Sequence, residues 1–142
     1  MRNCPKCGSV QKFVCSGNFR VNANGRNIDV WLIYKCQICD CTWNMTVLSR
    51  VKPEQIEQAL YTAFAENDPE TAFRYAFDKV LLSKNHAVID CSEPGYTLEK
   101  QTIDDGKNTV ELTCEYDLGL RLDKVISEGL SISRTRAKSL LQ

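Results

Sequence analysis

Two short cysteine pairs constrain this chain more than any other feature. Cys4 and Cys7 enclose two residues, and Cys36 and Cys39 repeat that spacing after an interval of 28 residues. Two residues between the cysteines let one tight turn direct both sulfur atoms toward one ion, and tetrahedral zinc takes four thiolate ligands. The spacing therefore predicts a zinc site made by Cys4, Cys7, Cys36 and Cys39.

One further cysteine leaves an alternative open at the second pair. Cys41 lies two positions after Cys39 and is a fifth candidate ligand. The repeated spacing favours Cys39, whereas a ligand pair formed by Cys36 and Cys41 would be the other solution. The three remaining cysteines lack such a partner and are expected to be free thiols; they are Cys15, Cys91 and Cys114.

Disulfides and a redox dithiol are the other uses of paired cysteines. No apolar targeting segment precedes Cys4, so we expect a cytoplasmic chain, where stable disulfides are rare. A redox dithiol would follow a strand and open a helix. Pro5 and Gly8 are typical of a turn instead, which favours the metal interpretation.

Alternating apolar residues predict three antiparallel strands around the cysteine pairs, over residues 13–22, 27–35 and 42–50. Asn24-Gly25 between the first two predicts a type I′ hairpin turn. The second strand carries Ile28, Val30, Leu32 and Tyr34 on one face and further apolar residues on the other, so we expect it to be central. These features are typical of a zinc ribbon, in which metal replaces part of a small core.

The middle of the chain predicts a helical hairpin. Pro53 opens a first helix that reaches about Glu66, because proline fits the first helical position. Asp68 and Pro69 supply a cap and a restart, and a second apolar stripe then runs to Leu81. We expect the hairpin to close at residues 83–85 and a short strand to follow at 87–89, with the single histidine, His86, in a structural role.

Two further elements complete the predicted fold. Residues 96–102 and 109–116 are expected to pair as a short β-hairpin around a polar turn. Residues 120–142 predict two short helices, the first with Leu122, Val125 and Ile126 on one face. The second is capped by Ser133 and has an apolar side of Ala137, Leu140 and Leu141. The fold class is therefore α+β: a zinc-ribbon-like antiparallel sheet, a central αα-hairpin, a short β-hairpin and a carboxyl-terminal helix pair.

Charge divides the chain of 142 residues into three segments although the net charge is zero. Residues 1–50 carry a net charge of +5, residues 51–117 carry −8, and residues 118–142 carry +3. We take these as the expected domains: a zinc-ribbon-like domain, an acidic middle and a basic helical end. Different charge signs predict different partners, and the basic ends favour nucleic acid. No apolar run approaches the ~20 residues that span a bilayer, so no membrane partner is expected.

The carboxyl-terminal segment resembles the start of an RNA-binding domain known from a small-subunit ribosomal protein and shared with pseudouridine synthases and tyrosyl-tRNA synthetases. The matching residues are Arg121-Leu122-Asp123-Lys124, Ser133-Arg134, Ala137 and Leu140-Leu141. This resemblance implies that two short helices present cations to structured RNA. The implied RNA-binding residues are Arg121, Lys124, Arg134, Arg136 and Lys138.

Most of the chain is also similar to a bacterial family of uncharacterised proteins. The shared features are an amino-terminal Cys-x-x-Cys pair, the segments 19–25 and 29–36, Cys39 followed by Thr42-Trp43-Asn44, and the ending at residues 121–124. That family has no assigned activity. The resemblance therefore supports the zinc-ribbon architecture more than any particular function.

These observations predict a zinc-binding, RNA-binding accessory protein that is not an enzyme. Four thiolates close the zinc coordination shell, and the sequence has no nucleophile elbow, phosphate loop or paired carboxylates. The alternative is a protein-interaction adaptor with a purely structural zinc site, whose docking face would be the acidic middle. Salt-dependent RNA binding separates these two hypotheses.

Overall fold

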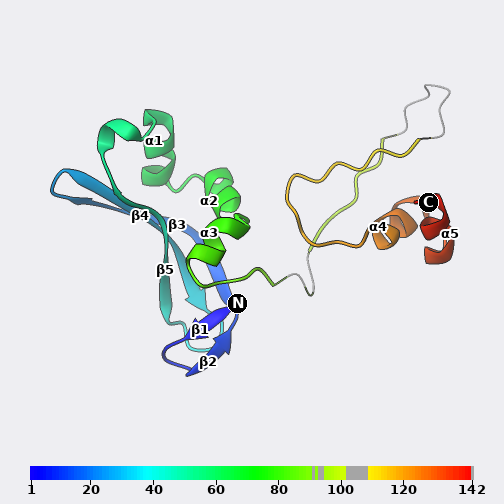
Figure 1. The fold of residues 1–142 in the computed structure, drawn as a ribbon, viewed down its shortest axis with the longest axis horizontal. Coiled ribbons are helices and arrows are strands. Elements are labelled where there is room, and N and C mark those ends of the chain that lie inside the picture. Colours follow the sequence, from blue (N-terminus) through cyan, green and yellow to red (C-terminus); the bar gives the residue numbers. More distant parts are fainter. Residues whose placement is uncertain (91, 93–94, 102–108, 142) are drawn as a thin grey trace. The chain divides into compact units, whose positions relative to one another are not determined.

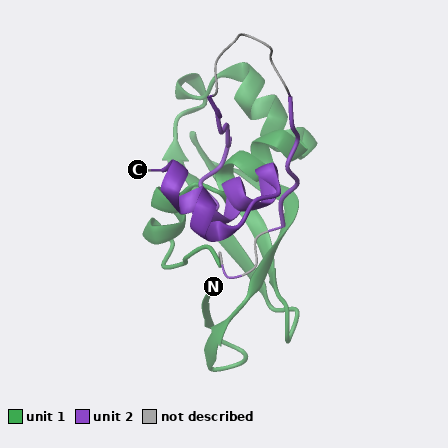
Figure 2. Cartoon of the chain, turned by 90° about the vertical axis from the view of Figure 1, so that its right-hand side faces the viewer, with its two compact units in different colours: residues 1–90 green, residues 91–142 purple. Residues whose placement is uncertain are grey.

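The structure is a computed structural model that describes residues 1–90, 92, 95–101 and 109–141. Packing divides the chain into two units, Met1–Asp90 and Cys91–Gln142 (Figure 2). The three segments expected from net charge, 1–50, 51–117 and 118–142, are a division by composition, whereas these two units are a division by packing. The mixture of strands and helices confirms the predicted α+β class.

Two antiparallel sheets form the amino-terminal part of the first unit (Figure 1). The small sheet pairs β1 (Arg2–Cys4) with β2 (Ser9–Gln11). The larger sheet has the order β3 (Phe13–Asn24), β4 (Asn27–Cys36) and β5 (Thr42–Val51). β4 is central, as its two apolar faces predicted.

The hairpin between β3 and β4 differs in detail from the predicted turn. Asn24 pairs with Asn27, which leaves Gly25 and Arg26 as the two turn residues. A type I′ turn needs positive φ at both central residues. Among the described residues of this turn only Gly25 has it, with φ of 64°. Glycine therefore occupies the first central position, and the type I′ prediction is wrong.

The inner face of the larger sheet forms the core. Val30, Leu32 and Met45 are completely buried, and Ile28 and Tyr34 are nearly so. This is the face that the alternation on β4 predicted. Burying such side chains stabilises each by about 1.5–3 kcal/mol relative to exposure, so the sheet supplies much of the apolar core.

Helices lie on one side of this sheet (Figure 1). A 3₁₀ turn at Pro53–Gln55 precedes α1 (Gln58–Glu66), and α2 (Pro69–Ala76) and α3 (Lys79–Lys84) follow. The buried face of these helices joins the sheet core through Phe64, Ala72 and Leu82.

Helix caps set the breaks between these helices. The Asp68 carboxylate accepts a hydrogen bond from Thr71 N at 2.7 Å, as the predicted cap requires. Asp78 does the same for Leu81 N at 2.8 Å and starts α3. The predicted second helix is therefore two helices, because Asp78 caps a new one where the apolar stripe looked continuous.

The segment after α3 is extended and is not the predicted strand over 87–89. Val88 exchanges two backbone hydrogen bonds with Met1, Val88 N to Met1 O at 3.0 Å and Met1 N to Val88 O at 2.8 Å. Lys12 Nζ lies 2.7 Å from Asp90 Oδ2 and holds the end of this segment. One residue pair does not extend into a ladder, which is why no strand forms there.

The second unit contains α4 (Leu122–Leu130) and α5 (Arg134–Leu140), the predicted helix pair. Ser133 caps α5 by accepting a hydrogen bond from Arg136 N at 3.2 Å. Val125, Ile126 and Ala137 are buried. Leu122, Leu140 and Leu141, which were expected on the apolar sides of the two helices, are about half exposed.

The predicted β-hairpin is not formed where the structure describes it. Residues 95–101 and 109–116 have no strand, and the turn at residues 102–108 lies outside the described residues. Tyr96 instead donates a hydrogen bond from its hydroxyl to Glu128 Oε2 at 2.7 Å, so this segment packs against α4. Among the described residues, no helix has both the length and the apolar character needed to cross a bilayer.

Candidate metal centre

The four predicted cysteines meet at one end of the first unit. Cys4 ends β1 and Cys36 ends β4, while Cys7 and Cys39 lie in the turns that follow. Their sulfur atoms all lie within 4.8 Å of one another, and Cys4 Sγ is 3.5 Å from Cys39 Sγ. Tetrahedral zinc with Zn–S bonds of about 2.3 Å needs sulfur atoms about 3.8 Å apart. The observed spacing fits that requirement.

The two turns share one backbone construction. Gly8 N donates to Cys4 O at 2.9 Å, and Asp40 N donates to Cys36 O at 2.9 Å. Gly8 has a φ of 70° and Asp40 a φ of 59°, so both turns close through the left-handed region. Glycine adopts this conformation freely and aspartate tolerates it. The repeated spacing of the cysteines thus reflects a repeated local fold.

The thiols of the cluster differ in acidity. Burial raises the pKa of Cys4, but hydrogen bonds from Cys7 and Lys6 backbone N–H groups and from the Cys39 thiol outweigh it and lower the pKa to about 6. The pKa of Cys7 is raised to about 12, chiefly by its hydrogen bond with Cys39. One thiolate therefore forms readily at neutral pH. A metal ion would displace the remaining thiol protons as it binds.

Arg2 supplies positive charge beside the cluster, and sequence reasoning missed it. Its guanidinium lies 4.3 Å from the centroid of the Trp43 ring and 5.9 Å from that of Phe13. Burial lowers its pKa, while electrostatic interaction with Cys4 and Cys41 raises it. Arg2 Nε is buried and has no hydrogen-bond partner among the described residues. A zinc ion with four thiolates would carry a net charge of about −2, which this cation would partly balance.

The other cysteines lie outside the cluster. Cys41 Sγ is 3.8 Å from Thr42 O and is not among the four grouped sulfur atoms. Cys15 is half-buried on β3, and Cys114 is exposed in the second unit. Cys91 lies outside the described residues. The geometry thus groups Cys39, rather than Cys41, with Cys36.

The cations expected to bind RNA are all exposed but not all free. Arg121 donates two hydrogen bonds to Asp123, Nε to Oδ1 at 3.0 Å and Nη2 to Oδ2 at 3.1 Å. Arg134 Nη2 donates to Asp123 Oδ2 at 3.2 Å. The Asp123 side chain is buried, and the hydrogen bond from Arg121 is the main reason that its pKa is lowered to about 2.

This ion-pair cluster joins the two helices. Arg134 is exposed at 56%, and it also connects α5 to the first turn of α4 through Asp123. Lys124 Nζ lies 5.9 Å from the Tyr96 ring centroid. Within the described residues, no ion pair involves Arg136 or Lys138. These two cations are the ones most available to a partner.

Comparison with known proteins gives one family. The family described as "Protein of unknown function (DUF1062)" matches residues 21–142. The matched region includes Cys36 and Cys39 and begins after Cys4 and Cys7. Comparisons with curated proteins and with solved structures gave no match.

Proposed function

The chain belongs to this family of proteins of unknown function, and from that premise we propose that it is a zinc-binding accessory protein that binds structured RNA and is not an enzyme. The four-cysteine cluster carries the proposal, because thiolates are soft ligands and a tetrahedral set of four suits zinc. Cys4, Cys7, Cys36 and Cys39 would hold the ion.

A structural role for the ion follows from the donor set. A catalytic zinc keeps one position open for water or substrate, whereas four thiolates fill the tetrahedral shell. Zinc here would join the β1–β2 sheet to the ends of β4 and β5, as the positions of the cysteines indicate. The metal therefore supplies folding free energy and no reaction.

The exposed cations of the second unit support RNA as the partner. Lys124, Arg136 and Lys138 are exposed on α4 and α5. Phosphate binding is electrostatic and needs clustered lysine and arginine, and structured RNA is recognised largely by shape and backbone. Arg121 and Arg134 would contribute less than expected from the sequence, because both already neutralise Asp123.

RNA binding is tested by a filter-binding titration with mixed structured RNA at 50 and 200 mM salt. The double variant Arg136→Ala/Lys138→Ala should bind all RNAs more weakly and flatten the salt dependence by about two units. Lys52→Ala/Lys84→Ala removes the same charge from exposed positions in the first unit and is the matched control. Equal retention of RNA by both double variants and the wild type would contradict the proposal.

A second candidate function is a protein-interaction adaptor. The specific observation in its favour is apolar exposure on α2 and α3, since Phe73 is 50% and Val80 66% exposed. Exposed apolar side chains on a helical surface are a common feature of protein-binding sites. Loss of partner binding in Phe73→Ser/Val80→Ser, with no loss of RNA binding in Arg136→Ala/Lys138→Ala, would favour this candidate.

A further inference from the structure

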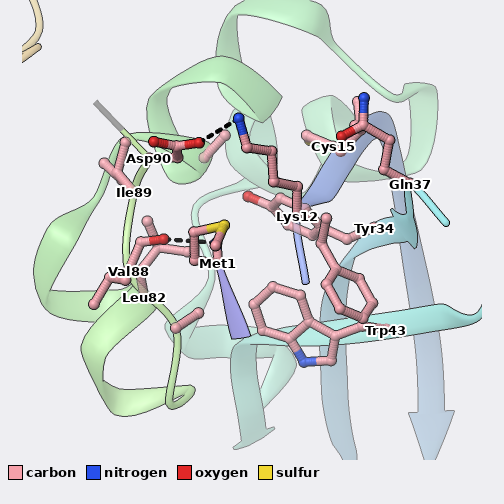
Figure 3. A pocket seen from close by; sticks show the side chains of 14 residues that line it. Met1, Lys12, Cys15, Tyr34, Gln37, Trp43, Leu82, Val88, Ile89 and Asp90 are labelled. Atoms are coloured by element: carbon pink, nitrogen blue, oxygen red, sulfur yellow. Dashed lines mark hydrogen bonds and ion pairs between the residues drawn. The ribbon is translucent and has the colours of Figure 1, made fainter. Parts of the chain in front are cut away.

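Within residues 1–90, no helix covers the outer face of the sheet formed by β3, β4 and β5. Helices α1, α2 and α3 lie on the other side of this sheet (Figure 1). Val30 and Leu32 are buried on that inner side, so Trp31, which lies between them on β4, belongs to the outer face. Trp43 belongs to the inner face, where it lines a hollow together with Tyr34 (Figure 3). The two tryptophans of the chain therefore mark opposite faces of one sheet.

An arginine packs on the outer tryptophan. Arg20 of β3 pairs directly with Trp31 of β4, and its guanidinium lies 5.9 Å from the centroid of the Trp31 ring. The face of an aromatic ring attracts a cation at this distance. Arg20 is exposed and forms no ion pair within the described residues. Its charge is therefore available to a ligand beside a ring that is only partly covered.

The same face continues along β4 with an apolar residue and then a cation. Ile33 is partly exposed and Lys35 is exposed. The neighbouring strands place the exposed Asn44 opposite Ile33 and the exposed Val14 opposite Lys35. Trp31 and Lys35 are four residues apart on one strand, which separates them by about 13 Å. The outer face thus offers a ring with a cation beside it, an apolar strip, and a second cation at the far end.

Negative charge is scarce on these strands. Between residues 13 and 51, two carboxylates stand against four cations, which are Arg20, Arg26, Lys35 and Arg50. Asp29 is 9% exposed, and its Oδ1 accepts a hydrogen bond from Arg50 N at 2.8 Å. The other carboxylate, Asp40, lies in the second cysteine turn and not on a strand. The charge of the face therefore suits an anionic ligand.

The ring and the flanking cations together indicate the class of that ligand. Proteins that bind single-stranded nucleic acid stack unpaired bases on exposed aromatic side chains and bind the phosphates with neighbouring cations. The bases of a duplex are already stacked on one another and are not free to lie on a sheet. An acidic peptide would satisfy the cations but supplies no base for the ring. Every base has a π face, so stacking here requires no particular base sequence.

We propose that the outer face of this sheet binds an unpaired, single-stranded segment of nucleic acid, with one base stacked on Trp31 and phosphates contacted by Arg20 and Lys35. This site goes beyond the proposed function, which assigns structured RNA to cations of α4 and α5, and it does not depend on it. All three residues belong to the first unit. RNA and DNA share this chemistry, so both serve as probes.

The test follows the two tryptophan indole N–H signals by NMR in the full ¹⁵N-labelled chain with zinc present. The probes are an octanucleotide of uridine and one of thymidine, each titrated at 50 mM salt. At least one of them should shift the Trp31 signal saturably, whereas the Trp43 signal, from the inner face, should stay in place. A blunt RNA duplex and an octaglutamate peptide should not shift Trp31, because neither offers an unpaired base.

Variants separate stacking from charge, with binding of the labelled octanucleotide measured by fluorescence anisotropy. Trp31→Val keeps a residue that favours strands but removes the ring, and it should weaken binding about five- to a hundredfold, as expected for one stacked base. Trp31→Phe keeps a ring and should bind more tightly than Trp31→Val. The amide signals of Leu32 and Met45 report whether each variant retains the folded sheet.

The two cations are tested by their effect on salt dependence. Arg20→Ala/Lys35→Ala should flatten it by about 1.4 units, because each phosphate contact to a single strand contributes about 0.7. Lys52→Ala/Lys84→Ala removes the same charge from exposed positions outside the strands and should leave the salt dependence unchanged.

Three results would overturn the proposal. The first is no saturable Trp31 shift with either octanucleotide. The second is an equal shift with the duplex or with octaglutamate. The third is equal affinity of wild type and folded Trp31→Val, or equal salt dependence of the two double variants. The first two use the wild-type chain and need no variant to fold. Arg136→Ala/Lys138→Ala should keep the Trp31 shift, so a failure of RNA binding by α4 and α5 is distinguishable from a failure of this site.

Discussion

Removing the metal should release the two cysteine turns and leave the sheet core folded. The core cluster is built from β3, β4, β5 and the helices, and none of the four clustered cysteines belongs to it. The β1–β2 sheet buries only Cys4 among its residues. The small sheet therefore has almost no apolar burial of its own to keep it ordered.

The magnitude follows from the length of this segment. Arg2–Gln11 comprises ten residues, and ordering a backbone residue costs about 1–2 kcal/mol, so the segment costs roughly 10–20 kcal/mol. Structural zinc in small modules supplies about 10–16 kcal/mol of apparent binding free energy. These two free energies are similar in size, so metal binding is large enough to offset the cost of ordering the segment. The short β1–β2 pairing alone is too small to offset it.

Hydrogen exchange with and without a chelator measures this directly. The amides of Gly8 and Asp40, which close the two turns, should lose their protection in EDTA. The amides of Leu32 and Met45, which pair in the core of the sheet, should keep theirs. Re-added zinc should restore the turns. Parallel loss of protection at Leu32 and Met45, or retained protection at Gly8 without metal, would refute this reasoning.

Three further predictions concern single side chains. Cys39→Ser should lose bound zinc in elemental analysis while Cys41→Ser keeps it, because only Cys39 lies in the sulfur cluster; the opposite result would assign Cys41 as the ligand. Phe64→Ala should lower the free energy of unfolding in urea by about 3–5 kcal/mol, since Phe64 is 1% exposed, whereas Val80→Ala at an exposed site should change it by less than about 0.5 kcal/mol. The pKa of Asp123 is lowered from 3.8 to about 2. Its contribution to the free energy of unfolding is therefore present above pH 4 and is lost as the pH falls toward 2. The Ala137 amide signal should report this loss, and Asp123→Asn should abolish the pH dependence.

The sequence predicted the sheet well because its signals are local and periodic. Alternation on β4 placed Val30 and Leu32 on the buried face, and the repeated cysteine spacing identified the four sulfur atoms that meet. Both signals depend on neighbours within a few residues. Tertiary packing then reinforced them, since the helices cover the same face that alternation marked as apolar.

The features that the sequence did not predict depend on particular side-chain contacts. The apolar stripe from Ala72 to Leu81 looked continuous, but the Asp78 carboxylate caps Leu81 N and divides it. The ion pair of Arg134 was not anticipated, because its partner, Asp123, lies eleven positions earlier on another helix. Neither a hydrophobic pattern nor a charge count contains the side-chain geometry that decides such cases.

Contacts near the metal centre join residues that are distant in the sequence, which is why the sequence alone did not identify them. Arg2 and Tyr34 lie far apart in the sequence, yet both contact Trp43, Arg2 by stacking at 4.3 Å and Tyr34 through ring centroids 4.8 Å apart. Arg2 belongs to the strand that ends in Cys4, and Tyr34 belongs to the buried core of the sheet. Trp43 therefore connects the strand of the metal centre to the core through direct contacts. Neither residue is distinguished by its neighbours in sequence, so only packing identifies Arg2 Nε as a buried donor beside the metal centre that has no hydrogen-bond partner among the described residues.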